Sequence, residues 1–258
     1  MITGIDHIII AVADLNVAVR SYRGLGFTVV PGGRHPVGTH NALISFADDS
    51  YVELIAFYEQ NPEHRWWAPL EKGGGLVDFC LQTDDLIADT DRFRRAGVQI
   101  EDPKGQSRIR PDGYHLRWVF SLPSGPHRGV APFLIRDETP REERVPRAMT
   151  HLNGVTGIAS VTVAVDDFAT VRGWYEKALG RPALEIQRDD LDGSGVRAVI
   201  GPHTFDFVAP RGVHGPLKDW LGAHGSSPYA AALRVAAGPA RTLDPAKTLG
   251  ARLSLVAS

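Results

Sequence analysis

The first apolar segment of the chain, residues 4–14, alternates like a buried β-strand. His7 lies on the same face of this strand as Ile9 and Ala11, and apolar residues also fill the other face. A histidine within such a strand needs a partner or a purpose, because burying an unpaired polar group is costly. Asp14 ends the segment and is placed to cap a helix that follows.

The pattern of strand, acidic cap and helix recurs twice more. The expected strands are 4–14, 75–85 and 157–167, and the expected helices are 15–23, 86–96 and 168–179, each ended by glycine. Three further strands are predicted after each helix, at 27–30, 40–46 and 51–57, then 98–101, 115–121 and 130–135, then 183–187, 196–200 and 205–209. A shortened fourth copy, without a convincing helix, is expected as strands 229–235 and 252–256.

These repeats predict an α+β fold built from βαβββ modules. Each module leaves one face of its sheet bare, so we expect modules to pair. The first two modules, 1–60 and 73–137, are expected to form a cupped eight-stranded half-barrel with a cavity at the seam, in a first domain of residues 1–137. A linker rich in charge and proline follows at 138–150. Residues 151–258 form a degenerate second half, with a module at 151–210 and a truncated module at 225–258.

Composition excludes several classes of protein. The chain has 258 residues, of which 43% are hydrophobic and 22% charged, with a formal net charge of -2. This balance is typical of globular proteins and offers no basic surface for nucleic acid or membrane. Its single cysteine, Cys80, fits a reducing compartment. With no signal peptide or long apolar run, we expect a cytoplasmic protein that binds a small molecule. No nucleotide-binding fingerprint is present, so no nucleotide cofactor is expected.

Glu53 is the second polar residue that draws attention, because it shares a strand face with Tyr51 and Ile55. A buried carboxylate needs a cation, a proton or hydrogen bonds, and His7 is the nearest candidate from a neighbouring strand. An imidazole and a carboxylate suit Zn, Fe, Mn, Ni or Co. The two side chains could equally form a polar pair in the core without a metal.

The sequence resembles the vicinal-oxygen-chelate superfamily, which includes glyoxalase I, bleomycin-resistance proteins and extradiol dioxygenases. The likeness is greatest to glyoxalase-like domain proteins, over about residues 1–137. It rests on these stretches: Asp6-His7, Asp14-Leu15, Leu25-Gly26-Phe27, GTHNAL at 38–43, YVELI at 51–55, Pro111-Asp112-Gly113 and PFLI at 132–135. The resemblance is specific for the fold and weak for the reaction, because one fold hosts many chemistries.

The resemblance also implies a set of metal ligands. In metal-dependent members the first strand of a module supplies His or Gln and the fourth strand supplies Glu, which here are His7 and Glu53. The second module has Asp78 and Phe133 at these positions. A site of His7, Glu53 and Asp78 is therefore the predicted metal centre, although a structural or substrate-contacting role for Asp78 is favoured. The two-histidine triad of extradiol dioxygenases is missing.

Further residues are predicted to line the cup. His40 and His115 start corresponding strands of the first two modules, so they could contact substrate, act as a general base or simply hydrogen-bond at strand ends. We predict Glu53 and His40 as catalytic residues. The predicted substrate-binding residues are His40, His115, Arg117, Trp118 and Phe133.

The expected function is that of a metal-dependent lyase or isomerase acting on a small molecule with vicinal oxygens, with a divalent transition metal (Zn, Ni, Fe, Mn or Co) as cofactor. The alternative is a non-catalytic protein of the same fold that sequesters a drug or toxin. A small-molecule ligand is the expected partner, and a homodimer is the assembly considered.

Overall fold

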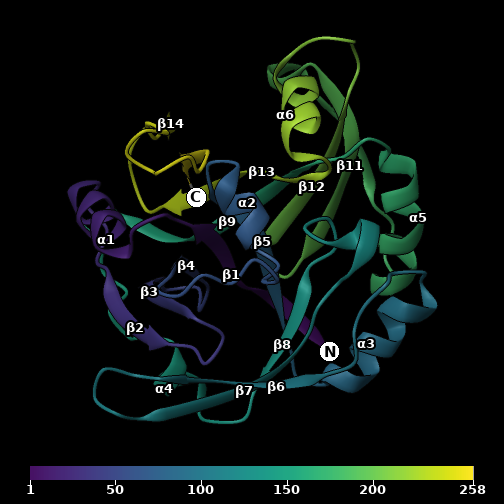
Figure 1. Ribbon diagram of the computed structural model, residues 1–258. Helices are drawn as coiled ribbons and strands as arrows, with labels where there is room; N and C mark the ends of the chain where they lie inside the picture. Colours follow the sequence, from purple (N-terminus) through teal and green to yellow (C-terminus); the bar gives the residue numbers. More distant parts are fainter. Residues whose placement is uncertain (258) are drawn as a thin grey trace.

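The computed structural model describes residues 1–257 and contains two β-sheets that lie side by side (Figure 1). The first eight strands form a closed barrel in the order β1-β4-β3-β2-β6-β7-β8-β5. These strands are β1 (Ile2–Ala11), β2 (Val30–Arg34), β3 (Thr39–Ser45), β4 (Tyr51–Phe57), β5 (Gly75–Thr83), β6 (Lys104–Ile109), β7 (His115–Ser121) and β8 (Phe133–Asp137). The predicted α+β class, with two modules joined in one eight-stranded sheet, is confirmed.

The register of the barrel explains why both modules face one interior. The first and last strands of each module pair in parallel, β1 with β4 and β5 with β8. The antiparallel pair of β1 and β5 joins the two modules, and in it His7 lies opposite Cys80. His7 therefore sits in the middle of the sheet, with a strand of its own module on one side and a strand of the second module on the other.

The barrel is closed, whereas the sequence predicted a half-barrel. Strands β2 and β6 meet at a single residue pair, Arg34 and Ile109. Gly33, at φ 146°, permits this approach, because a Cβ there would collide with the carbonyl of Ile109. Because a single residue pair closes the barrel, the closure has no hydrophobic pattern from which it could be predicted.

The second strand of module two is also displaced from its predicted place at 98–101. The structure has β6 at Lys104–Ile109, and Ile100 makes only an isolated bridge to Pro123. Val98 and Ile100 instead join the core outside the barrel. The hydrophobic pattern of the sequence does not predict β6, because its polar side chains point into the barrel and its other face points toward solvent. Neither face carries the apolar alternation of an ordinary buried strand.

Six α-helices and two short 3-10 turns complete the described part of the chain. The helices are α1 (Leu15–Gly24), α2 (Trp67–Glu71), α3 (Leu86–Arg95), α4 (Arg141–Arg144), α5 (Phe168–Leu179) and α6 (Pro216–His224), and the 3-10 turns are Gly125–His127 and Asp189–Leu191. The predicted caps are present: the carboxylates of Asp14, Asp85 and Asp167 accept backbone N–H bonds at the starts of α1, α3 and α5. Within residues 1–257, none of the helices is long and apolar enough to cross a bilayer.

The second sheet repeats the barrel pattern incompletely. Its order is β10-β11-β12-β9-β13-β15-β14, with β9 parallel to β12 and antiparallel to β13. The strands are β9 (Val155–Ala164), β10 (Leu184–Arg188), β11 (Gly193–Ile200), β12 (His203–Pro210), β13 (Ser227–Val235), β14 (Arg241–Thr242) and β15 (Leu253–Ala257). As predicted, β13 is followed by no helix. Helix α6, which was not predicted, packs Leu217 and Leu221 against Val208 on the same sheet face that carries Asp206. The counterpart of the barrel interior is thus covered by a helix.

The two sheets share one hydrophobic core. Phe79 on β5 packs against Phe205 on β12, with ring centroids 5.5 Å apart, and both side chains are fully buried. The hydroxyl of Tyr22 in α1 donates to the carbonyl of Thr248, which ties the first module to the C-terminal segment. Because the core is continuous, we expect the two halves to unfold together.

We predict that Phe205→Ala lowers the free energy of unfolding of the whole chain by about 3–5 kcal/mol, because it leaves a cavity between the sheets. Urea unfolding followed by fluorescence and by circular dichroism tests this, and both signals should shift in one transition. Leu184→Ala, at a position 60% exposed, should change stability little. A variant that unfolds in two steps, with the barrel unaffected, would contradict a shared core.

Candidate functional site

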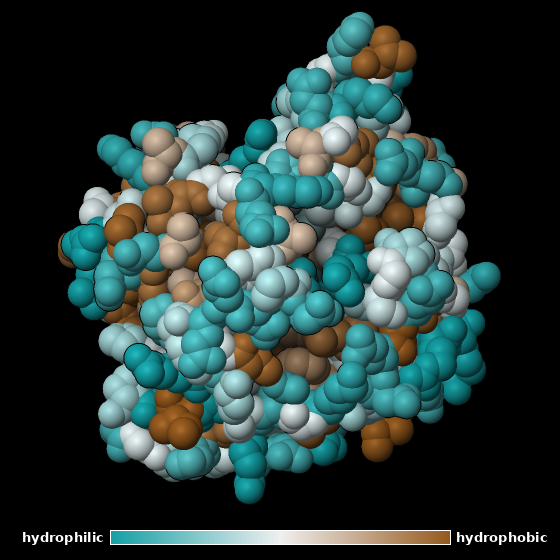
Figure 2. All heavy atoms as spheres, viewed as in Figure 1, coloured by the Kyte–Doolittle hydropathy of each residue, from teal (hydrophilic) through white to brown (hydrophobic). Residues whose placement is uncertain are grey.

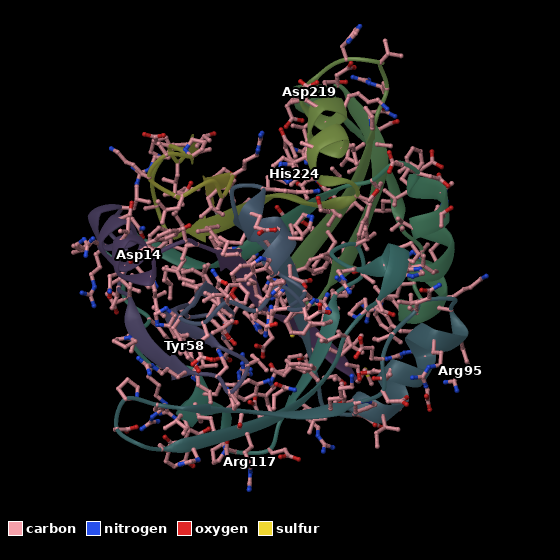
Figure 3. The ribbon with its side chains drawn as sticks, viewed as in Figure 1. Asp14, Tyr58, Arg95, Arg117, Asp219 and His224 are labelled. Atoms are coloured by element: carbon pink, nitrogen blue, oxygen red, sulfur yellow. The ribbon has the colours of Figure 1, made fainter. Side chains whose placement is uncertain are left out.

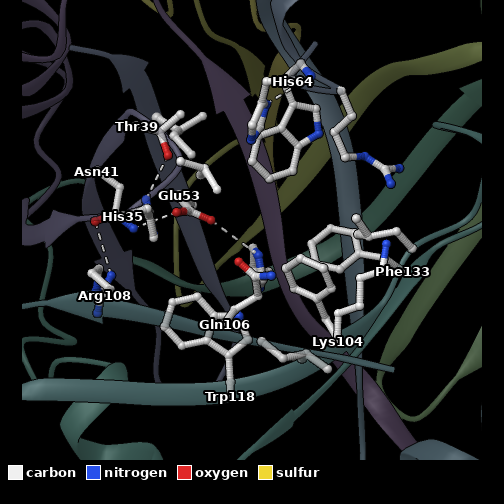
Figure 4. A pocket seen from close by; sticks show the side chains of 18 of the residues that line it. His35, Thr39, Asn41, Glu53, His64, Lys104, Gln106, Arg108, Trp118 and Phe133 are labelled. Atoms are coloured by element: carbon white, nitrogen blue, oxygen red, sulfur yellow. Dashed lines mark hydrogen bonds and ion pairs between the residues drawn. The ribbon is translucent and has the colours of Figure 1, made fainter. Parts of the chain in front are cut away.

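The barrel encloses a cavity of about 390 Å³ with two different walls. The wall from module one is polar, with His7, His35, Asn41, Tyr51 and Glu53. The opposite wall, from β7, β8 and the residue after β7 in module two, is apolar and is formed by Trp118, Phe120, Leu122, Phe133 and Ile135. The close-up shows Glu53 and His35 on one side, with Trp118 and Phe133 across from them (Figure 4). From outside, this face of the molecule is largely hydrophilic, and hydrophobic residues show through a recess near its centre (Figure 2).

His7 and Glu53 meet at the polar wall. The Nε2 atom of His7 lies 3.4 Å from Oε2 of Glu53, and the two residues are 3% and 7% exposed. They come from the parallel strands β1 and β4, in which His7 pairs with Tyr51. Glu53 lies two residues beyond Tyr51 and therefore on the same face. The imidazole also stacks on the Tyr51 ring, with centroids 4.5 Å apart.

A second carboxylate holds the other nitrogen of His7. The Nδ1 atom lies 2.7 Å from Oδ1 of Asp6, a fully buried neighbour on the same strand. A register shift in β1 between Ile5 and His7 allows these adjacent side chains to meet, although regular strand neighbours point apart. With Nδ1 on Asp6, the Nε2 atom of His7 is presented to Glu53 and the cavity.

The charge of Asp6 is balanced by residues of the predicted linker. Arg144 donates to both carboxylate oxygens, at 3.0 and 2.9 Å, and Arg141 also contacts Asp6. Arg144 also donates to the hydroxyl of Tyr51 at 2.6 Å and pairs with Asp137. Burial raises the pKa of Asp6, but the two guanidinium groups outweigh it and hold that pKa well below its usual value. Two arginines of the segment 138–150 therefore balance the carboxylate behind His7, and one of them, Arg144, also lines the cavity.

Burial and neighbouring charges also act in opposite directions on the pKa values of His7 and Glu53. Burial raises the pKa of Glu53, but the hydrogen bond and charge of His7 lower it to about 2. Burial lowers the pKa of His7, yet its bonds to Asp6 and Glu53 raise that pKa above 6.5 overall. Each member of the pair therefore favours the charged form of the other. Burial lowers the pKa of His35 and of His64 to about 4, so both are neutral at pH 7.

The structure brings together four of the predicted site residues, His7, Glu53, Trp118 and Phe133, around the cavity. His40, His115 and Arg117 are not among its lining residues. His40 packs edge-on against Tyr58, His115 is exposed, and Arg117 points away from the barrel (Figure 3). The catalytic and substrate-binding roles expected of these three residues stay predictions.

Asp78, the third predicted metal ligand, also lies outside the lining. Its carboxylate accepts hydrogen bonds from Trp66 Nε1 at 2.9 Å and from the backbone N–H of Phe79 at 3.0 Å. Arg65 Nη2 lies 2.8 Å from the same carboxylate. Its metal role stays a prediction, and the guanidinium group of Arg65 balances its charge without a metal ion.

Several lining residues were missed by the sequence interpretation. His35 and His64 lie in connecting segments, where no periodicity marks them. Arg144 also gave no signal, since its segment shows no apolar pattern. A signal for β6 did exist, because Lys104, Gln106 and Arg108 alternate as the inward face of a strand and all three line the cavity.

Two groups of side chains near the cavity could form a metal centre. Within residues 1–257, Asp6, His7 and Cys80 bring potential ligand atoms within 4.8 Å of one another, which makes them a possible metal site by distance. However, the carboxylate of Asp6 is already bound by arginine side chains. Burial also raises the pKa of the Cys80 thiol well above its usual value, which disfavours the thiolate that a metal needs. The pair of His7 and Glu53 fits better: a nitrogen and an oxygen donor face the cavity, and Asp6 orients the imidazole as ligand-supporting carboxylates do. The apolar Phe133 cannot contribute a ligand from module two.

We predict that the stabilising contribution of Glu53 to the fold is lost in acid. Its pKa is lower in the folded state than the ordinary 4.5, so its stabilising effect is complete above that value and is lost as the pH falls toward about 2. The difference in unfolding free energy between wild type and Glu53→Gln should shrink over this range, by on the order of a few kcal/mol. Urea titrations at several pH values measure it, with Glu63→Gln as an exposed control. A constant difference would show that Glu53 is not held ionised by His7.

Comparisons with known proteins agree with this architecture. Over 113 residues, or 39% of the chain, the sequence is 28% identical to an ethylmalonyl-CoA/methylmalonyl-CoA epimerase of Cereibacter sphaeroides, of which 75% is covered. A hypothetical protein from Staphylococcus aureus has the same fold, with a TM-score of 0.73, 16% identity, and coverage of 98% of this chain and 99% of that one.

A mutant of 4-hydroxymandelate synthase from Streptomyces coelicolor also shares the fold, with a TM-score of 0.64, 19% identity, and coverage of 92% of this chain and 72% of that one. Residues 5–179, about two thirds of the chain, match the family described as Glyoxalase-like domain. With its paired βαβββ modules and its match over most of its length, the chain belongs to the glyoxalase-like domain family of the vicinal-oxygen-chelate superfamily.

Proposed function

We propose that this chain is an enzyme of lyase or isomerase type that acts on a small molecule with neighbouring oxygens in the barrel cavity. The observation that carries the proposal is the His7–Glu53 pair, which faces the cavity while Asp6 holds the far side of the imidazole. If His7 and Glu53 were only a structural polar pair in the core, they would need neither the adjacent cavity of about 390 Å³ nor the Asp6 carboxylate on the other side of the imidazole. Both features are typical of sites that move protons or hold metals.

His7 and Glu53 would hold a divalent transition metal. When bound, such an ion would polarise the substrate oxygens and stabilise negative charge on them. Asp6 would keep the Nδ1 proton of His7 in place, and the two arginines would keep Asp6 ionised. Without a ligand from Phe133, the remaining coordination positions would be left to substrate or water.

Glu53 is the residue proposed to carry a proton. Its carboxylate reaches the cavity, and Asn41 donates to its Oε1 atom at 2.5 Å, which fixes its orientation. The relative named as an epimerase supports this class of chemistry, because inverting a centre beside a carbonyl requires a proton to leave and return. The apolar side chains of β7 and β8 would limit the access of bulk water to the anion formed in between.

A second candidate function is non-catalytic binding. It is favoured by the apolar wall of module two, where Phe133 stands at a position that is a ligand in metal-dependent members. Trp66 lies over Phe133, with ring centroids 6.4 Å apart, so an aromatic surface faces the polar one. A hydrophobic compound could be sequestered there without any reaction.

Metal content separates the two functions. We predict near-stoichiometric Zn, Ni, Co, Mn or Fe in protein purified without chelator, measured by mass spectrometry, and its loss in both His7→Ala and Glu53→Gln. Deuterium exchange from solvent into 2-oxo acids and β-dicarbonyl compounds, followed by NMR, should fall by about 10²–10⁴-fold in Glu53→Gln.

Glu63→Gln is the matched control, because Glu63 also lines the cavity but is exposed. It should retain the metal and the exchange. A wild-type protein that takes up no metal even after reconstitution, and exchanges no deuterium, would refute the enzyme and leave the binding function.

A further inference from the structure

Arg108 is a buried cation on the cavity wall that has no carboxylate partner. It is 3% exposed and belongs to the lining of the cavity. Within residues 1–257, no acidic side chain lies within 4 Å of its guanidinium nitrogens, and its Nε atom has no hydrogen-bond partner. Fully buried arginines are almost always paired, because desolvating an uncompensated charge is expensive.

The partners that Arg108 does have are neutral. Its Nη1 atom donates to the amide oxygen of Asn41 at 3.1 Å, and its Nη2 atom donates to the backbone carbonyl of Arg144 at 3.0 Å. Glu53 reaches it only through the Asn41 amide, since Asn41 Nδ2 donates to Glu53 Oε1. Two of the five N–H donors of the guanidinium group are therefore used, and neither bond brings a negative charge to it.

The other deeply placed arginines differ from Arg108 in this respect. Arg144 is paired with Asp6 and Asp137, and Arg65 is paired with Asp78. Each of these charges is balanced within the protein. Among the buried arginines that line the cavity in the described part of the chain, Arg108 is thus the one whose counter-ion the protein does not supply.

The barrel seam is built to admit this guanidinium group. Gly32 on β2 lies against it, and a Cβ at Gly32 would collide with the Asn41 side chain and come within 2.9 Å of Arg108 Nη1. On β6, Gln106 and Lys104 continue the same inward face toward the solvent (Figure 4). Polar side chains therefore line one path from the mouth of the cavity to Arg108.

We propose that the ligand of this cavity carries an anionic group, a carboxylate or a phosphate, which binds at Arg108, while its apolar body packs against Trp118 and Phe133. Arginine presents a planar fork of donors that matches either group. The inference rests on the proposed function only in placing the ligand in the same cavity. Anion binding at Arg108 stands or falls separately from proton transfer at Glu53.

Benzoate and benzamide provide the test, because they have nearly the same size and differ in charge. Calorimetric titration of wild-type protein should show benzoate binding at least about tenfold more tightly than benzamide. Arg108→Gln should abolish that preference, and Arg108→Lys should keep part of it. Arg136→Gln, an exposed position on the outer face of β8, should leave it unchanged. Phenyl phosphate, measured beside benzoate, decides which anion the site prefers.

The proposal is overturned if wild-type protein binds neither anion, binds benzoate and benzamide equally, or keeps its preference in Arg108→Gln. Circular dichroism and thermal unfolding establish that each variant is folded, and Arg108→Lys provides the charge-retaining comparison if the glutamine variant is unstable. If the wild-type protein shows no proton exchange but prefers benzoate, and that preference survives in Glu53→Gln, the proposed reaction is refuted and the anion site is supported.

Discussion

The fully buried carboxylate of Asp6 is the point on which the site depends. It holds the Nδ1 atom of His7 on one side and the guanidinium groups of Arg141 and Arg144 on the other. A charge this deep persists only while its partners remain, and removing one partner from such a network typically costs about 3–5 kcal/mol. The carboxylate of Asp6 thereby holds the segment 138–150 against the barrel and fixes the orientation of the His7 imidazole.

The repeated modules have diverged at one structural position, with different consequences for chemistry. The fourth strand of module one carries Glu53 beside His7, whereas the equivalent position of module two is the apolar Phe133. In module three it is Asp206, which Arg188 and Arg197 neutralise, on the sheet face that α6 covers. One pair of modules thus retains an accessible polar wall, and the other has become a packed, structural half that shares its core with the barrel.

The cavity combines groups that are expensive to bury with groups that favour burial. Its polar wall contains an ion pair, an amide that links Glu53 to Arg108, and two imidazoles that burial keeps neutral. The facing aromatic wall excludes water and strengthens the electrostatic interactions across from it. Such a division suits a ligand with a charged end and an apolar end.

The sequence by itself determined the modules, their helix caps and the strand faces that carry His7 and Glu53, because strand and helix periodicities are local. Only the tertiary structure decided that the barrel closes, since one pair of residues makes the contact. Arg144 and His64 reach the site from segments without periodicity, and Arg108 does so from a polar strand. The position of Arg144 depends on its charge balance with Asp6, which lies 138 positions away, so the pairing leaves no local pattern.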